Sequence, residues 1–370
     1  MKVLTVFGTR PEAIKMAPIV KELKTRPTME VVVAVTGQHR EMLDQVLKIF
    51  EIVPDYDLNI FKHGQTLTDI TIGALKGLEP ILEKEKPDIL LIQGDTTTVF
   101  SGSLAAFYHQ IPIGHVEAGL RSGNLYSPYP EEANRKLTGI LTKYHFAPTK
   151  RNKEHLLRED YPEEDIYITG NTVIDALKYT VQENYEFEDK ILNTLDYKNK
   201  KIILLTSHRR ENLGDPMDRI FSVVRTIVEE YPEVEVVFPR HLNPKVREIS
   251  DRHLKDHPRI HLIEPLDYLP FTNLMAKSYF VITDSGGIQE EAPSLGKPVL
   301  VVREETERPE GVEAGTAKLI GTQSEPLYKA CKELLEDFEE YKKMAHAINP
   351  YGDGEAAKKI VDILEQSEKL

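Results

Sequence analysis

Short apolar runs alternate with longer amphipathic stretches along most of the chain, and this alternation restricts the possible folds more than any other feature. The runs are apolar on both faces, which is typical of parallel strands in a sheet covered by helices on both sides. They fall into two series, so the sequence predicts two doubly wound α/β domains. The expected strands are residues 2–7, 31–35, 88–92, 111–116 and 145–147 in the first series, and residues 201–206, 234–238, 260–263, 279–283 and 298–302 in the second.

The length and the connecting segments indicate where the two domains lie. A chain of 370 residues is too long for one compact core. Residues 181–200 are rich in Glu, Asp, Asn and Lys and lack a strand pattern, so we expect a linker between domains at 1–180 and 201–350. Residues 351–370 are expected to contain a final amphipathic helix. In proteins of this design the ligand occupies a cleft between the carboxyl ends of both sheets, and we expect the site there.

Composition excludes several classes of function. The net charge of −13 argues against a general nucleic-acid binder, because phosphate backbones require a basic face. The single cysteine, Cys331, excludes an internal disulfide and fits a reducing compartment. No apolar run approaches the roughly 18 residues that span a bilayer, and the first apolar run is typical of a strand rather than of a signal peptide. We therefore expect a cytoplasmic protein without nucleic-acid or membrane partners.

The segment 115–135 concentrates charged side chains next to a predicted strand end. Glu117 directly follows the strand 111–116. Glu131 and Arg135 are four residues apart, so they share one face of a predicted helix. A carboxylate at a strand end, facing a carboxylate held beside an arginine, is a plausible acid/base pair. A surface loop with solvated charges is the alternative.

Two further predicted strands in the first half also end in polar residues. Arg10 follows the first strand and lies near a helix N-terminus, which suits an anion, and Lys15 is one turn further on. The glycine spacing of a dinucleotide site is absent here, so no nicotinamide cofactor is predicted. Asp95 follows the third strand and is either a helix cap or a second carboxylate close to Glu117.

In the second half, the strand ends carry groups suited to phosphates. Residues 206–212 place His208 beside two arginines, which favours an anionic partner. Residues 283–291 combine a strand end, a Ser-Gly-Gly turn and a helix start, which can present backbone N–H groups to a diphosphate. Glu291 lies one turn into that helix and can accept hydrogen bonds from ribose hydroxyls, and Arg308 supplies another cation.

With these motifs in order, the chain resembles the non-hydrolysing UDP-N-acetylglucosamine (UDP-GlcNAc) 2-epimerases of bacteria and archaea over essentially its whole length. The motifs are Gly-Thr-Arg-Pro-Glu at 8–12, Gly-Asp-Thr-Thr-Thr at 94–98, His-Val-Glu-Ala-Gly-Leu-Arg at 115–121, Pro-Glu-Glu-Ala-Asn-Arg at 130–135, Gly-Asn-Thr-Val-Ile-Asp at 170–175, His-Arg-Arg-Glu-Asn at 208–212, His-Leu-Asn-Pro at 241–244, Asp-Ser-Gly-Gly-Ile-Gln-Glu-Glu-Ala-Pro at 284–293 and Asn-Pro-Tyr-Gly-Asp-Gly at 349–354.

The resemblance implies two Rossmann-like domains, as in glycosyltransferases of the GT-B type, with the final helix packed on the first domain. It implies reversible inversion at carbon 2 between UDP-GlcNAc and UDP-N-acetylmannosamine (UDP-ManNAc), through elimination of UDP and re-addition to 2-acetamidoglucal. It further implies a homodimer, no metal or redox cofactor, and a supply of ManNAc units for cell-surface polysaccharides. A hydrolysing 2-epimerase, a UDP-sugar glycosyltransferase and a catalytically silent UDP-sugar sensor remain alternatives.

The resemblance also implies roles for individual residues. Catalysis is assigned to the carboxylates and the histidine Asp95, Glu117, Glu131 and His208. Arg135 from the charged segment joins the residues expected to bind the UDP-sugar, which are Arg10, Lys15, Phe271, Ser285, Gly286, Gly287, Glu291 and Arg308. A second, allosteric UDP-GlcNAc is expected near Gln38 and His39, although Gly64 stands where some regulated members carry arginine, so regulated and unregulated behaviour both stay open.

Overall fold

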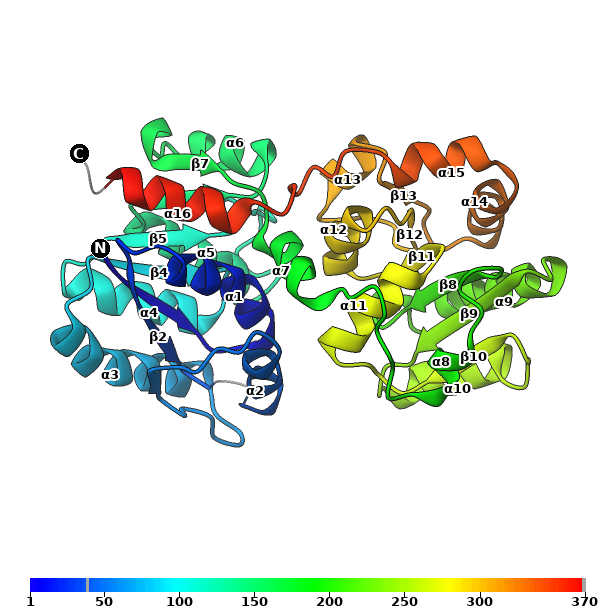
Figure 1. Cartoon of the computed structure of the whole chain (residues 1–370), viewed down its shortest axis with the longest axis horizontal. Coiled ribbons are helices and arrows are strands. Elements are labelled where there is room, and N and C mark those ends of the chain that lie inside the picture. The colour runs from blue at the N-terminus through cyan, green and yellow to red at the C-terminus, as the bar shows by residue number, and fades with distance from the viewer. Residues whose placement is uncertain (38–39, 368–370) are drawn as a thin grey trace. The chain divides into compact units, whose positions relative to one another are not determined.

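The computed structural model describes residues 1–37 and 40–367 and divides into two compact units (Figure 1). The first unit comprises Met1–Tyr179 together with Tyr351–Leu370, and the second comprises Thr180–Pro350. Within the described parts of the chain, no helix has both the length and the apolar character needed to cross a membrane.

The first unit is built on a parallel sheet of seven strands in the order β3-β2-β1-β4-β5-β6-β7. Strand order reverses beside β1, because β2 and β4 pair with its two edges. In the register of β4 and β5, Gln93 lies opposite Val116, so the residues that follow both strands emerge at the same edge. The strands are β1 (Lys2–Phe7), β2 (Glu30–Val35), β3 (Tyr56–Asp57), β4 (Ile89–Gln93), β5 (Ile113–Val116), β6 (Tyr144–Ala147) and β7 (Ile166–Ile168).

Helices connect these parallel strands, and a helix from the end of the chain joins them. The last helix lies against the first one (Figure 1), and Arg26 binds Asp362 at 2.7 Å and Glu365 at 3.0 Å there. The helices are α1 (Arg10–Lys24), α2 (Arg40–Ile49), α3 (Leu67–Glu85), α4 (Thr97–Tyr108), α5 (Glu131–Leu141), α6 (Lys150–Arg158), α7 (Thr172–Thr180) and α16 (Ala356–Ser367).

The second unit repeats the doubly wound plan with a parallel sheet of six strands in the order β10-β9-β8-β11-β12-β13. Strand order reverses between β8 and β11, where Thr206 lies opposite Thr283. The strands are β8 (Lys201–Thr206), β9 (Val234–Pro239), β10 (Ile260–Ile263), β11 (Phe280–Thr283), β12 (Val299–Val301) and β13 (Ala317–Leu319). The helices are α8 (Lys190–Thr194), α9 (Asp215–Glu230), α10 (Pro244–Leu254), α11 (Tyr268–Lys277), α12 (Gly286–Ser294), α13 (Pro309–Glu313), α14 (Ser324–Glu336) and α15 (Phe338–Ala345).

The prediction of two doubly wound, Rossmann-like domains is confirmed, but two details differ. Strands β3, β7 and β13 were not predicted, because each has only two or three residues and some of them are exposed. The expected linker at 181–200 belongs to the second unit instead. Its side chains Phe187 and Leu192 are buried, and Asn273 accepts a hydrogen bond from the Gln182 N–H at 2.8 Å. The sequence analysis did not assign these apolar residues to a core, because the residues around them are mostly charged or polar.

Candidate active site

Glu117 lies directly after β5 in an unusual conformation. Its φ of 63° places it in the left-handed region, which a residue with a Cβ seldom adopts. Its side chain is nevertheless buried. Such backbone strain persists only where surrounding contacts hold it, and it often marks a functional site. The carboxylate predicted from the strand-end pattern therefore stands out in the structure as well.

Nitrogen donors from three separate segments surround the Glu117 carboxylate. Lys15 Nζ, from α1, and Asn171 Nδ2, at 3.2 Å, both donate to Oε2. Arg135 Nη2, from α5, donates to Oε1 at 3.3 Å, and its Nη1 donates to the Glu117 carbonyl. Charge-assisted hydrogen bonds of this kind stabilise the ionised carboxylate and fix its direction.

Arg135 joins Glu117 to Asp95. Its Nη2 donates to Asp95 Oδ2 at 2.5 Å, and only 2% of the residue is exposed. Burial alone would lower the pKa of the guanidinium, but Asp95 and Glu117 raise it above its ordinary value. With Lys15, the cluster contains two carboxylates and two cations, so their formal charges balance.

Glu131 and Arg135 both belong to α5, four residues apart as expected, but the hydrogen bonds of Arg135 go to other carboxylates. Arg135 binds the two strand-end carboxylates instead, because the register of β4 and β5 brings them to one edge. In the described part of the chain, Glu131 Oε2 is buried without a hydrogen-bond partner. The neighbouring Glu132 accepts the N–H groups of Ser122 and Gly123. An unpaired buried oxygen is costly, which is consistent with a group reserved for a ligand.

The turn after β1 is fixed by a buried carboxylate that the sequence analysis did not single out. Glu12 Oε2 accepts the N–H groups of Gly8 at 2.7 Å and Thr9 at 2.8 Å, and Thr96 donates to its other oxygen. Gly8 is required here, because an added Cβ would lie 2.0 Å from Thr36 Oγ1. Arg10 starts α1 and makes no ion pair with any residue in 1–37 or 40–367.

His115 is a second residue whose place was not predicted. Its Nε2 lies 2.7 Å from the Gly94 carbonyl, next to Asp95. Burial, followed by the charge of Arg135, holds the pKa of His115 well below its ordinary value. A neutral, buried histidine bonded to a backbone carbonyl supports the turn that carries Asp95 rather than exchanging protons with a ligand.

In the second unit, Asp284 organises the turn that carries His208. Asp284 is fully buried, and Oδ2 accepts the N–H groups of His208 at 2.9 Å and Arg209 at 3.0 Å. Side chains of Ser207 and Asn212 donate to the same oxygen at 3.1 Å. Burial would raise the pKa of Asp284, but the bonds from His208 and its neighbours hold it below its ordinary value. An ionised Asp284 therefore anchors this turn.

His208 itself is partly exposed and is oriented from one side. Its Nδ1 lies 3.2 Å from Asp284 Oδ1, and its ring stacks on His241 with centroids 5.8 Å apart. Its Nε2 makes no hydrogen bond to a described residue. The ring is thus held by one nitrogen and can present the other to a ligand.

The Ser-Gly-Gly turn forms the start of α12, as predicted. Ser285 is the N-cap and makes no side-chain capping bond, so the first-turn N–H groups, including those of Gly286 and Gly287, lack a cap from that side chain. Arg308, paired with Glu290, lies beside this turn, since a Cβ added to Gly286 would be 3.9 Å from the guanidinium. A helix start flanked by a cation suits a phosphate group.

Glu291, expected to bind ribose, already has a neighbour in the structure. The Tyr268 hydroxyl donates to Glu291 Oε2 at 2.9 Å, and burial together with this carboxylate raises the pKa of Tyr268 well above its ordinary value. Phe271 is three residues further along α11 than Tyr268, so the two rings lie on the same side of that helix.

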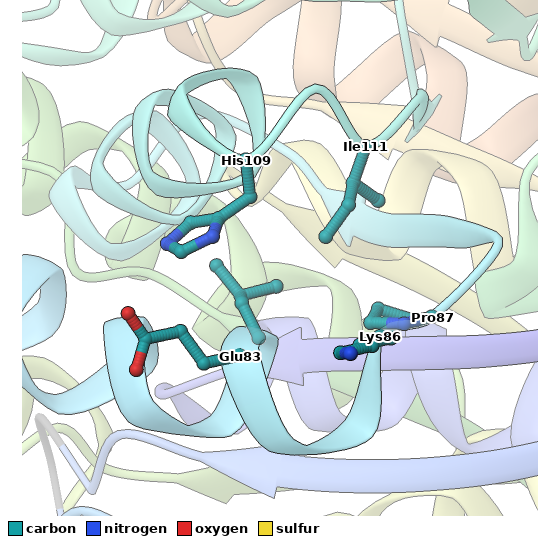
Figure 2. A pocket seen from close by; sticks show the side chains of 6 residues that line it. Glu83, Lys86, Pro87, His109 and Ile111 are labelled. Carbon is teal, nitrogen blue, oxygen red and sulfur yellow. The ribbon is translucent and has the colours of Figure 1, made fainter.

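One pocket in the first unit does not contribute to these clusters. Figure 2 shows a pocket between the ends of α3 and α4, lined by Glu83, Pro87, His109 and neighbouring residues. Pro87 precedes β4, so this pocket lies at the amino edge of the sheet, opposite Glu117. Gln38 and His39 lie outside the residues that the structure describes.

Comparison with known proteins shows the family to which the chain belongs. A family model described as UDP-N-acetylglucosamine 2-epimerase matches residues 21–365. The chain belongs to this family. A UDP-N-acetylglucosamine 2-epimerase from Bacillus subtilis (strain 168) is 59% identical over 365 residues, which cover 98% of this chain and 95% of that protein. The enzyme of the same name from Escherichia coli (strain K12) is 54% identical over 373 residues, covering 99% of each chain.

The epimerase family is also represented among solved structures. The crystal structure of UDP-GlcNAc 2-epimerase from Neisseria meningitidis, bound to UDP-GlcNAc, matches with a TM-score of 0.87 and 52% identity. The match covers 99% of this chain and 100% of that one. The prediction of this family from the motifs is confirmed, and the protein is an enzyme of the epimerase class. Asn171, His115 and Asp284 all lie within those motifs, which was the available signal for them.

Proposed function

We propose that this protein interconverts UDP-GlcNAc and UDP-ManNAc by inverting carbon 2 of the sugar. The observation that carries the proposal is Glu117, a buried carboxylate in a strained conformation, held beside Asp95 in a chain of this family. The relative from Neisseria meningitidis, which binds UDP-GlcNAc, supports the same substrate class.

The reaction requires a base at carbon 2 and a stabilised leaving group. No carbonyl adjoins carbon 2, so its proton cannot be removed to give a stable anion. In the proposed route a base takes this proton, the C–H electrons form a double bond between carbons 1 and 2, and the bond from carbon 1 to the diphosphate oxygen breaks. UDP leaves with that electron pair. Re-addition of UDP to carbon 1 and of a proton to the opposite face of carbon 2 completes the inversion without redox change.

We assign the proton transfers to the carboxylates Asp95, Glu117 and Glu131. Glu117 and Asp95 are fixed by Lys15 and Arg135, while the free oxygen of Glu131 supports a role in contact with the sugar. Each can act as a general base or acid, and the assignment of each to one face of carbon 2 stays open. Arg10, which lacks an ion-pair partner among the described residues, is assigned to the substrate diphosphate.

The second unit is proposed to hold UDP. The start of α12 at Ser285, Gly286 and Gly287 and the nearby Arg308 suit a diphosphate. His208, oriented by Asp284, is assigned to the departing phosphate oxygen. Glu291 and Phe271 are assigned to the ribose and the base.

Incubation of the protein with UDP-GlcNAc alone in D₂O tests this proposal. We expect UDP-ManNAc at equilibrium, with deuterium at carbon 2 observed by NMR. Oxygen-18 in the bridge between carbon 1 and phosphorus should appear in non-bridging positions of recovered substrate if the released diphosphate rotates. Free ManNAc would instead indicate a hydrolase, and unchanged substrate would indicate a transferase or a sensor. Inversion without deuterium at carbon 2 would rule out the elimination route.

We further propose that the protein is a cytoplasmic homodimer that supplies ManNAc units for surface polysaccharides. Packed helices α4 and α5 support the dimer, because Tyr108 and Ile140 are 69% and 70% exposed on them and Phe107 and Leu137 are exposed nearby. Sedimentation analysis of Ile140→Lys should show a shift toward monomer. The matched control Ile348→Lys, on an exposed residue of the second unit, should leave the assembly unchanged.

A further inference from the structure

Asn171 contacts Glu117 but lies outside the residues assigned to the substrate. It precedes α7 and is 3% exposed. Its Oδ1 accepts a hydrogen bond from the N–H of Val173, in the first turn of α7, at 3.2 Å. Its Nδ2 donates to Glu117 Oε2 at 3.2 Å. Because one end of the amide is used by the helix, the other end is directed at the carboxylate.

The backbone of Asn171 is held by a distant part of the chain. Its N–H donates to the Tyr351 carbonyl at 2.7 Å. The contact depends on two glycines, since a Cβ added to Gly170 would lie 3.2 Å from Tyr351 O and from Gly352 Cα. Both glycines have positive φ, of 89° and 132°, which a side chain would disfavour.

A second contact, one helical turn further along, fixes the same returning segment. Asp175 is buried, and its two oxygens accept the N–H groups of Ala356 at 3.2 Å and Ala357 at 2.8 Å, at the start of α16. Asn171 and Asp175 are four residues apart and belong to the same stretch of chain. Residues 351–357 are therefore attached to the element that carries the amide beside Glu117.

We infer that Asn171 is a positioning residue for Glu117 and that residues 351–357 set its place. The inference rests on the proposed function, in which Glu117 exchanges a proton with carbon 2. Lys15 and Arg135 supply charge to Glu117 through long side chains. Asn171 supplies direction through a short side chain whose backbone is held by Tyr351, and small errors in the position of a reacting group lower the rate steeply.

Two substitutions of Asn171 separate positioning from helix capping. Asn171→Asp keeps an oxygen for the Val173 N–H, and aspartate is a good cap, but it replaces the donor to Glu117 with an acceptor. Asn171→Ala removes both. We expect kcat to fall at least about 10-fold in both variants. The affinity for UDP, measured by calorimetry, should stay within about twofold of wild type, because the residues assigned to UDP are untouched.

The outcomes are distinct. If Asn171→Asp retains wild-type kcat while Asn171→Ala does not, the residue is only a cap and the inference fails. It also fails if both variants match wild type. Formation of UDP-ManNAc by the wild-type protein tests the proposed function separately, because the inference about Asn171 depends only on the kcat of each variant relative to the kcat of wild type. If wild type forms no UDP-ManNAc, the same ratios are taken from carbon-2 deuterium exchange.

Asp175→Ala tests the returning segment without changing a neighbour of Glu117. We expect kcat to fall about fivefold with unchanged UDP affinity, because α16 loses the cap that holds residues 351–357. The matched control is Asp337→Ala, since Asp337 accepts two N–H groups at the start of α15 in the second unit. The control should keep wild-type kcat. Equal kcat in Asp175→Ala, Asp337→Ala and wild type would show that the segment does not set the position of Glu117, and would overturn that part of the inference.

Discussion

Glu117 and Asp284 each directly follow an interior strand of a doubly wound sheet, Glu117 after β5 and Asp284 after β11, yet they are held in different ways. Asp284 receives backbone N–H groups and short side chains from a single turn, which keep it ionised and fixed. The Glu117 carboxylate accepts hydrogen bonds from the side chains of Lys15 in α1, Arg135 in α5 and Asn171 just before α7. The backbone of Glu117 itself is in the left-handed region. The first arrangement maintains a structure. The second brings side chains from three segments of the fold onto one carboxylate.

The largest expected difference concerns turnover. Glu117→Gln should lower kcat at least about 100-fold, the usual size of an acid/base contribution, while UDP affinity stays within about threefold of wild type. Steady-state assays and calorimetry measure the two quantities. Glu159→Gln, which removes a carboxylate paired with Arg121 in the same unit, is the control and should lower kcat only slightly. Near-normal turnover in Glu117→Gln would show that Glu117, like Asp284, has no catalytic role.

Asp284→Asn should affect stability instead. The amide places N–H groups against the N–H donors of His208 and Arg209, so the free energy of unfolding should fall by about 2.5 kcal/mol. Denaturant unfolding measures this change. Asp196→Asn, in an exposed turn of the same unit, should change stability by less than about 0.5 kcal/mol. A catalytic defect in Asp284→Asn without any loss of stability would contradict a structural role.

The third prediction compares the effects of a buried and an exposed histidine on the pH dependence of stability. Burial lowers the pKa of His145 in the first unit to about 4, with Asp165 opposing and Arg121 adding to the shift. Its contribution to stability is therefore complete above about pH 6.5 and is lost as pH falls toward 4. Between pH 7 and 4.5, wild type should lose about 2 kcal/mol relative to His145→Asn. His346→Asn, at an exposed position, is the control variant in the same unfolding experiments.

The smallest predicted effect lies in the second unit. Arg308→Ala should weaken UDP binding about 10-fold, near 1.5 kcal/mol, since it removes a charge-assisted contact. Arg247→Ala, which breaks an exposed pair with Glu264, is the matched control and should leave UDP affinity unchanged. Equal affinity in both variants would place the diphosphate elsewhere.

Sequence periodicity predicts the central strands well, because strands buried on both faces are continuous apolar runs. It misses β3, β7 and β13, which have two or three residues that are not all buried and so do not form a continuous apolar run. Residue type and strand ends also identify Glu117, Asp95 and the start of α12 as candidates. They do not predict that Arg135 binds Asp95 and Glu117, since that pairing depends on the register of β4 and β5. Nor do they predict the Asn171 contact, because the Tyr351 carbonyl that holds it comes from much later in the chain.

The first unit is interrupted by the second, and this has a consequence for biosynthesis. A chain that leaves the ribosome from its N-terminus folds domain by domain. The seven-stranded sheet can form early, but residues 351–367 emerge only after the whole second unit has been translated. Until then α1 lacks its partner helix and the N–H of Asn171 lacks the Tyr351 carbonyl. The support that residues 351–357 give to Asn171, and through it to Glu117, is therefore added last in the synthesis of the chain.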